Sequence, residues 1–192
     1  MLKNRKYKLK AKKNGFSFVE LIVAVFIFVL VVTTSTEVFV KMIKNYKSAR
    51  EIQRDLEDAQ YAMNLMAKTI RTSSVTDPSV PSNVSDIIIF DYSQNKCIKY
   101  AFTVNKLQYG LDSTSLTKEE CTIANMSGVS LSDMISGYVN NGNFAVIPSA
   151  SGVVGKVTIS MQICPASGCP AGADKVQIQT SVSLRDYTEA GI

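Results

Sequence analysis

The sequence predicts an α+β protein in which a long N-terminal helix, half membrane-spanning and half amphipathic, packs on a C-terminal antiparallel β-sheet. Three observations support this. An apolar run lies near the N-terminus, a helical periodicity follows it, and short strand-like segments fill the rest. With 192 residues, the chain can form one globular domain and an extension. We expect four parts: a leader at 1–15, a membrane half of the helix at 16–40, an amphipathic half at 41–71, and a β-rich domain at 72–192.

The first fifteen residues concentrate the positive charge of the chain. Seven of the 21 basic residues lie there with no acidic residue, which leaves 14 basic against 16 acidic residues and a net charge of −2 for the rest. The basic residues after Arg71 are scattered. A basic patch for nucleic acid is therefore not predicted.

The apolar run that follows is long enough to cross a membrane. From Phe16 to Val32 only Ser17 and Glu20 interrupt it. Extended to Val40, it gives about 25 residues, or roughly 37 Å of helix. Because basic residues precede it, we expect the N-terminus on the cytoplasmic side of the inner membrane and the globular domain outside the cytoplasm.

Two ordinary explanations compete for this segment. A secretory signal peptide requires a small-x-small cleavage site after its apolar core, and Thr33–Thr36 is a weak match. A plain signal anchor explains the hydrophobicity but not Glu20. A carboxylate inside an apolar run is unfavourable unless it is paired or lies at the interface, and such residues are usually functional.

The residues from Gly15 to Glu20, Gly-Phe-Ser-Phe-Val-Glu, resemble the type III signal of type IV prepilins and pseudopilins. The resemblance implies cleavage after Gly15 by prepilin peptidase, N-methylation of the new terminus at Phe16, and pairing of Glu20 with the N-terminal ammonium of a neighbouring subunit. It also implies other pilin or pseudopilin subunits and an inner-membrane assembly platform as partners. Charge neutralisation between Glu20 and that ammonium would offset their desolvation.

The helix is expected to continue without a break to about Arg71. Apolar residues recur at steps of three or four, as in a helical stripe. They are Met42, Tyr46, Ala49, Ile52, Leu56, Ala59, Met63, Met66 and Ile70. Charged residues between them, Asp55 and Asp58 included, are assigned to a solvated face. The stripe can pack under a sheet or against another helix, and its Ala and Tyr residues favour the sheet.

The remainder reads as strands separated by polar segments. Residues 72–86 are predicted to form a loop, and residues 111–142 an irregular stretch with a short segment at 129–135. Strands are predicted at 86–92, 97–104, 106–110, 144–147, 156–164 and 175–184, the first three as an antiparallel meander. The stretch 179–187 resembles the end of J-type pseudopilins and W-type minor pilins, which implies a minor subunit. A generic edge strand is the alternative.

The four cysteines, Cys97, Cys121, Cys164 and Cys169, lie in the predicted extracytoplasmic domain. Disulfides are favoured over free buried thiols, because the count is even in a chain with a membrane-targeting start. They are favoured over a metal site, because Cys164 and Cys169 have no second close cysteine pair. Short separations favour closure, so we expect Cys97–Cys121 and Cys164–Cys169 rather than the crossed pairings.

No catalytic constellation is recognisable. The chain lacks histidine, the commonest general base and metal ligand. Asp112, Glu119 and Glu120 lack calcium-loop spacing, so a solvated loop is favoured there. We therefore expect no cofactor, no metal and no enzymatic activity. The sequence predicts a structural subunit of a type IV pilus or type II secretion pseudopilus; a single-pass extracytoplasmic binding or adhesion module is the alternative.

Overall fold

The computed structural model describes residues 15, 17–112, 114, 117–164, 169–170, 172 and 175–185. The leader residues 1–14 and Phe16 lie outside the described residues. The chain separates into two compact units, with the division between Tyr46 and Lys47.

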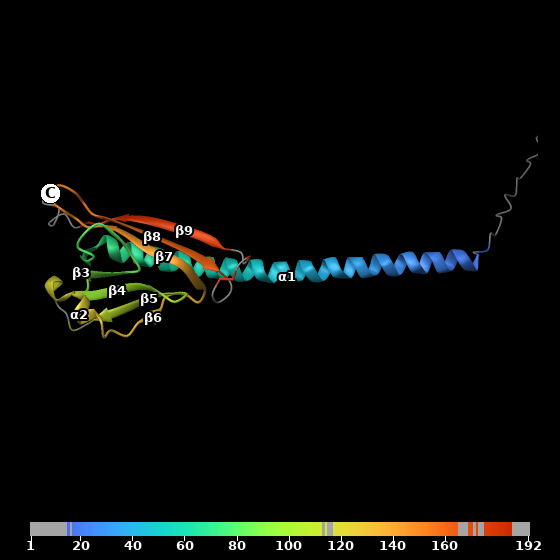
Figure 1. The fold of residues 1–192 in the computed structure, drawn as a ribbon, viewed down its shortest axis with the longest axis horizontal. Helices are drawn as coiled ribbons and strands as arrows, with labels where there is room; N and C mark the ends of the chain where they lie inside the picture. Colours follow the sequence, from blue (N-terminus) through green and yellow to red (C-terminus); the bar gives the residue numbers. More distant parts are fainter. Residues whose placement is uncertain are drawn as a thin grey trace, which may run out of the picture. The chain divides into compact units, whose positions relative to one another are not determined.

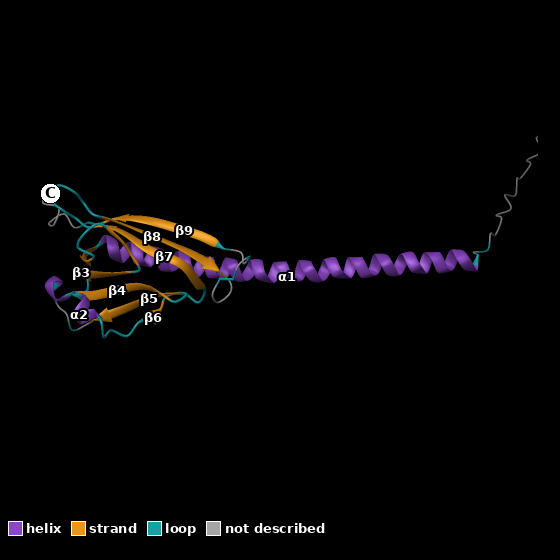
Figure 2. Ribbon diagram, in the orientation of Figure 1, coloured by secondary structure: helices purple, strands orange, loops and turns teal. Residues whose placement is uncertain are grey.

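One helix, α1 (Phe18–Arg71), contributes to both units and has 54 residues (Figure 2). The prediction of an uninterrupted helix is confirmed, and the reason is local: no Pro or Gly occurs within these bounds. The helix ends at Arg71, where Lys68 and Arg71 place positive charge in the last turn, beside the carbonyl end of the helix dipole. Thr72 then closes the end by donating from its backbone nitrogen to the oxygen of Thr69, at 3.1 Å.

The rest of the chain forms two antiparallel sheets, where the sequence predicted one (Figure 1). The five-stranded sheet has the order β1 (Ser73–Asp77), β3 (Asp86–Asp91), β4 (Lys96–Thr103), β5 (Lys106–Asp112) and β6 (Ser132–Asp133). The four-stranded sheet has the order β2 (Ser82–Val84), β7 (Tyr138–Ile147), β8 (Lys156–Cys164) and β9 (Val176–Ser183). Two short helices, η1 (Lys118–Glu120) and α2 (Ile123–Met126), lie between β5 and β6 in the chain.

The predicted meander is present as β3, β4 and β5, which pair consecutively and antiparallel. Its two turns each contain an asparagine with positive φ: 50° at Asn95 and 59° at Asn105. Asparagine tolerates this left-handed conformation better than most residues, and this explains the tight turns.

The prediction that residues 72–86 form a loop is wrong, because β1 and β2 lie there. Ser73 and Ser74 are polar yet buried, because β1 pairs with β3 and is part of the five-stranded sheet. The Ser73 hydroxyl is satisfied by the oxygen of Thr69, at 2.6 Å. Backbone pairing therefore overrides a composition that is typical of loops.

The prediction for β7 was too short. This strand begins at Tyr138 rather than Phe144 and contains a bulge between Asn140 and Asn143. Asn141 has a φ of 50°, and a side chain at Gly142 would collide with the ring of Phe102. The polar residues at the bulge interrupt the alternation of apolar residues from which a strand is predicted, so the first part of β7 was missed.

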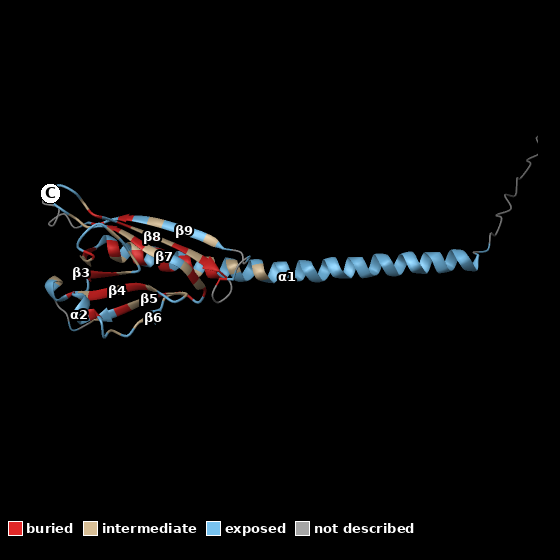
Figure 3. Cartoon of the chain, in the orientation of Figure 1, coloured by how far each residue is buried: buried red, intermediate tan, exposed pale blue. Residues whose placement is uncertain are grey.

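The core lies in the unit that begins at Lys47, where the last turns of α1 pack against both sheets (Figure 3). Ala59, Met63, Met66 and Ile70 of the predicted stripe are buried. This confirms the sheet as the partner for this part of the helix. The stripe was predicted from Met42 onward, but its burial begins only at Asp55.

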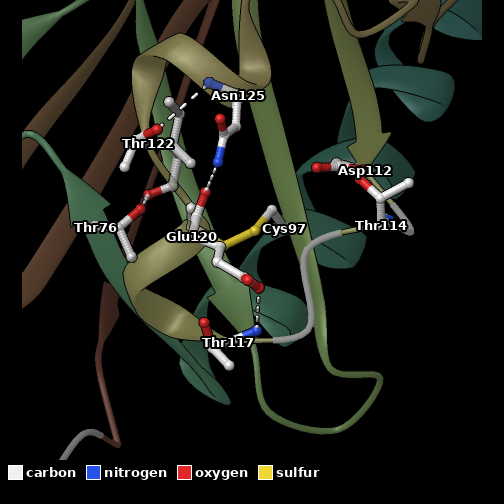
Figure 4. Close-up of a disulfide and its surroundings, with 10 residues drawn as sticks. Thr76, Cys97, Asp112, Thr114, Thr117, Glu120, Thr122 and Asn125 are labelled. Atoms are coloured by element: carbon white, nitrogen blue, oxygen red, sulfur yellow. Dashed lines mark hydrogen bonds between the residues drawn. A yellow bond between two sulfur atoms is a disulfide. The ribbon is translucent and has the colours of Figure 1, made fainter.

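The two disulfides join Cys97 to Cys121 and Cys164 to Cys169, with Cα–Cα distances of 5.5 and 5.7 Å. The first ties the segment holding η1 and α2 to β4 (Figure 4). Ile88, Phe90 and Met126 pack around it as a second small core. The disulfide thus holds a segment with little regular structure of its own against the sheet.

Candidate functional site

The part of α1 from Phe18 to Tyr46 is the most unusual surface of the described chain, because each of its residues is exposed (Figure 3). Phe18, Phe28 and Phe39 are 77%, 68% and 62% exposed. α1 is long and apolar enough to cross a membrane, with a mean hydropathy of 2.6 over its most apolar window. Apolar surface of this extent requires a membrane or other helices to cover it.

The threonine hydroxyl groups in this part of α1 are satisfied within the helix. Thr33 and Thr34 each donate to the oxygen of Leu30, at 2.9 and 3.0 Å, and Thr36 donates to the oxygen of Val32, at 2.8 Å. Because these polar atoms need no outside partner, they do not oppose burial in an apolar environment.

Glu20 differs from these residues, because its charge has no partner among the residues that the structure describes. It lies in the first turn of α1, where the first helical bond joins the Leu21 nitrogen to the Ser17 oxygen at 3.2 Å. Among the described residues, none makes an ion pair with Glu20. It lies at the end of α1 where the helix dipole is positive.

Gly15 is exposed, and a Cβ built on it would meet no atom within 4 Å. Nothing among the surrounding atoms therefore crowds the residue that precedes the predicted cleavage point. Phe16, the predicted methylated residue, lies outside the described residues.

The predicted solvated loop around Asp112, Glu119 and Glu120 uses two of its carboxylates in local capping (Figure 4). Asp112 accepts from the backbone and hydroxyl of Thr114, at 2.8 and 2.6 Å. Glu120 accepts from the Thr117 nitrogen at 3.1 Å, as in a capping box. Across the described ranges, no group of three His, Cys, Asp or Glu side chains is placed to hold a metal ion.

Two carboxylates assigned to a solvated face instead contact the turn before β7. Ser136 donates a hydrogen bond to Asp58, and a Cβ on Gly137 would lie 3.0 Å from the Cβ of Asp55. Asp55 is only 6% exposed. Burial raises the pKa of Asp55, and the guanidinium of Arg54 partly opposes that rise. In the sequence, only the Ser-Gly pair at 136–137 indicated that the backbone of this turn could lie so close to another element.

Comparison with known families identifies the N-terminal segment. The model of the family described as the prokaryotic N-terminal methylation motif matches residues 10–36. This motif is the hallmark of proteins of the type IV prepilin and pseudopilin type.

The chain carries the N-terminal methylation motif that type IV prepilin-type proteins share.

The match includes Gly15, Phe16 and Glu20 and the start of the exposed apolar part of α1. The helix followed by antiparallel sheets is consistent with a pilin fold. No curated protein and no solved structure matches the chain.

Proposed function

We propose that this protein is a structural subunit, a minor one, of a type IV pilus or a type II secretion pseudopilus, assembled through the N-terminal part of α1. The observation that carries the proposal is the exposed apolar surface from Phe18 to Tyr46, with one unpaired carboxylate, Glu20, in its first turn. A catalytic or small-ligand role has no use for such a surface, whereas bundling with other helices covers it.

Processing follows from the same motif. Prepilin peptidase removes residues 1–15 by cutting after Gly15, and the new terminal amine of Phe16 is methylated. The helix stays attached to the body because the cut precedes it, so the product remains anchored in the inner membrane. The basic leader places the N-terminus in the cytoplasm, and the two disulfides support an extracytoplasmic globular unit.

Glu20 acts in assembly as the partner of the Phe16 amine of a neighbouring subunit. Inside a helix bundle within the membrane, an unpaired carboxylate and an unpaired ammonium are both strongly unfavourable. Their pairing removes both penalties only when a second subunit arrives, so it favours the assembled state over the isolated one.

The minor role rests on the end of the chain. The stretch from Gln179 to Tyr187, of which the structure describes residues up to Arg185, resembles the close of J-type pseudopilins and W-type minor pilins. In this protein the stretch begins in β9, one of the two edge strands of the four-stranded sheet.

A single-pass extracytoplasmic binding module is the second candidate. One observation favours it: a cavity of about 300 Å³ between α1 and the five-stranded sheet, lined by Tyr61, Leu65, Tyr100, Tyr109 and Leu111 among others. It is small for a ligand site, and the apolar part of α1 would then serve only as an anchor.

Two measurements test the assembly role. Mass spectrometry of mature protein, from a host that carries the peptidase, should show a methylated N-terminus at Phe16; a retained Met1 would contradict the proposal. Glu20→Gln should leave membrane insertion intact and remove most of the protein from sheared filaments. Glu37→Gln is the matched control, because Glu37 already pairs with Lys41 at 2.6 Å. Equal incorporation of the two variants would favour the anchored binding module.

A further inference from the structure

The charged residues of α1 beyond its apolar part are sorted by sign. Residues 41–50, the basic segment, hold four basic residues and no acidic one: Lys41, Lys44, Lys47 and Arg50. Residues 51–58 hold four acidic residues and one basic residue. A solvated helix face usually mixes the two signs at spacings of three and four residues, because opposite charges at those spacings stabilise the helix. Pairing within the helix therefore does not explain the basic segment.

The acidic residues nearest to the basic segment leave most of its charge uncompensated. Lys41 pairs with Glu37 at 2.6 Å. Lys47 has Glu51 four residues after it, in the order that is less favourable for a helical ion pair, and Lys44 has no acidic residue three or four positions away. Among the described residues, neither Lys44 nor Lys47 makes an ion pair.

Apolar and aromatic side chains lie between these basic residues and are exposed with them. Met42 and Tyr46 are 69% and 68% exposed, and Ile43 is 41% exposed. Tyrosine is enriched where a membrane helix meets water, because its ring is apolar and its hydroxyl is polar. Exposed basic, apolar and aromatic side chains on one helical segment are typical of a membrane surface.

The basic segment also lies at the right height in α1 for lipid headgroups. No charged residue occurs from Leu21 to Thr36, and the apolar run reaches Val40. Lys44 and Lys47 lie about 6 and 10 Å beyond Val40 along the helix axis. The headgroup layer extends roughly 5–8 Å beyond the hydrocarbon core. Long side chains of a helix lean toward its N-terminus, which here is the direction of the membrane, so both ammonium groups reach this layer.

Basic residues are scarce on the extracytoplasmic side of membrane helices, and the proposed function places the basic segment there. The seven basic residues of the leader still set the orientation during insertion. Once the leader is removed, as the proposed function requires, Lys41 is the first basic residue of the chain. The mature protein then has positive charge next to the membrane on the extracytoplasmic side alone.

We propose that the basic segment binds anionic phospholipids of the extracytoplasmic leaflet, with Lys44 and Lys47 on the headgroup phosphates and Tyr46 beside the acyl chains. Each lysine contacts a lipid on its own, and each strengthens the attraction to an anionic membrane surface about fivefold. These contacts fix the depth of α1 in the membrane before assembly. The inference rests on the proposed function, which places residues 41–50 at that surface.

The test uses a reporter at the centre of the basic segment. The chain has no tryptophan, so Tyr46→Trp introduces a single one. The full chain with this change is reconstituted in vesicles of phosphatidylcholine and phosphatidylglycerol in equal parts, with bromine on the acyl chains of one lipid or of the other. Bromine quenches tryptophan fluorescence on contact, so the two quenching values give the relative affinity of the two lipids. Phosphatidylglycerol should be preferred about fivefold or more.

Lys44→Gln/Lys47→Gln in the same reporter chain should reduce this preference to below about twofold. Lys68→Gln/Lys156→Gln is the matched control, because it removes two positive charges from exposed residues of the globular unit. The control should keep the preference. Added sodium chloride should weaken the preference in the reporter chain, because salt screens exposed charges.

Four results would overturn the inference. Equal quenching by the two lipids would remove the preference, and quenching by neither would place residue 46 outside the bilayer. A loss of the preference with inorganic phosphate, beyond that with sodium chloride of the same ionic strength, would make free phosphate the ligand. The fourth concerns energy transfer between labelled copies of the chain in the vesicles. If Lys44→Gln/Lys47→Gln weakens it and leaves the lipid preference unchanged, acidic side chains of a neighbouring subunit are the partner.

The lipid preference and the assembly role fail in different ways. Glu20→Gln should leave the preference unchanged while the protein is lost from sheared filaments, because lipid binding at the basic segment does not involve Glu20. A chain that keeps the preference but is never incorporated into filaments would contradict the proposed function alone. A chain that is incorporated normally without the preference would contradict the lipid contact alone.

Discussion

The two parts of α1 have similar chemistry and opposite environments. From Phe18 to Tyr46 the apolar side chains are exposed, as Phe28 shows at 68%. From Lys47 to Arg71 one apolar stripe is buried under the sheets, and Met66 is 0% exposed. The difference is one of partner: the second part packs against the sheets of the same chain, whereas the apolar side chains of the first part have no covering partner among the described residues.

The largest effect is expected when a side chain in the buried stripe of α1 is shortened. Met66→Ala should lower the free energy of unfolding of the globular unit by about 2–5 kcal/mol, because it leaves a cavity in a packed core. Leu30→Ala, in the exposed part, should change it by less than about 0.5 kcal/mol. Denaturant unfolding in detergent, followed by tyrosine fluorescence, measures both. A comparable loss in Leu30→Ala would break the distinction between the two parts.

Removing each disulfide tests whether the stability of the globular unit is independent of the membrane insertion of α1. Replacing both Cys97 and Cys121 by Ser should cost about 3 kcal/mol, because the cysteines are 24 residues apart. The same change at Cys164 and Cys169, five residues apart, should cost about 2 kcal/mol. Denaturant unfolding gives the order of the two costs. Membrane insertion should be unchanged in both variants, and its loss would couple the two units.

A smaller effect is expected where α1 touches the turn before β7. Gly137→Ala should cost about 1 kcal/mol, because the new Cβ lies 3.0 Å from Asp55 and the neighbouring groups must shift. Gly128→Ala is the matched control, since its Cβ would meet no atom within 4 Å. Thermal unfolding of the two variants side by side checks this, and equal transitions would show that the contact relaxes freely.

The smallest effect concerns the charge on Asp55. The pKa of this buried carboxyl is raised above its ordinary value of 3.8, so the folded state holds the proton more tightly than the unfolded state. Ionisation therefore destabilises the fold as pH rises through and above 3.8. Asp55→Asn should raise the free energy of unfolding at neutral pH by at most about 1 kcal/mol, with loss of the Arg54 contact opposing the gain.

The pH dependence of the Asp55→Asn effect is the control. The gain should vanish below pH 3.8, where Asp55 is protonated in both states. Urea unfolding of Asp55→Asn and of the unchanged protein, at neutral pH and below pH 3.8, measures this gain in the free energy of unfolding. A gain of the same size at both would assign the effect to packing rather than to charge.

Much of the fold was predictable because its signals are local. The span of α1 follows from apolar periodicity and the lack of Pro or Gly, and the N-terminal motif occupies one short window. The meander of β3 to β5 followed from alternating segments separated by Asn95 and Asn105. The cysteine pairs in the structure are those between the nearest cysteines in the sequence, at separations of 24 and 5 residues.

The tertiary structure alone decided which polar residues are buried and how the strands are divided between two sheets. Ser73, Ser74 and Asp55 read as solvated residues in the sequence, but packing of α1 and β1 against distant strands covers them. The division into two sheets depends on the order in which strands far apart in the chain pair. A contiguous stretch of sequence encodes its own helix, turn or processing signal. It does not encode which distant segment covers it, because that choice minimises the free energy of the whole chain.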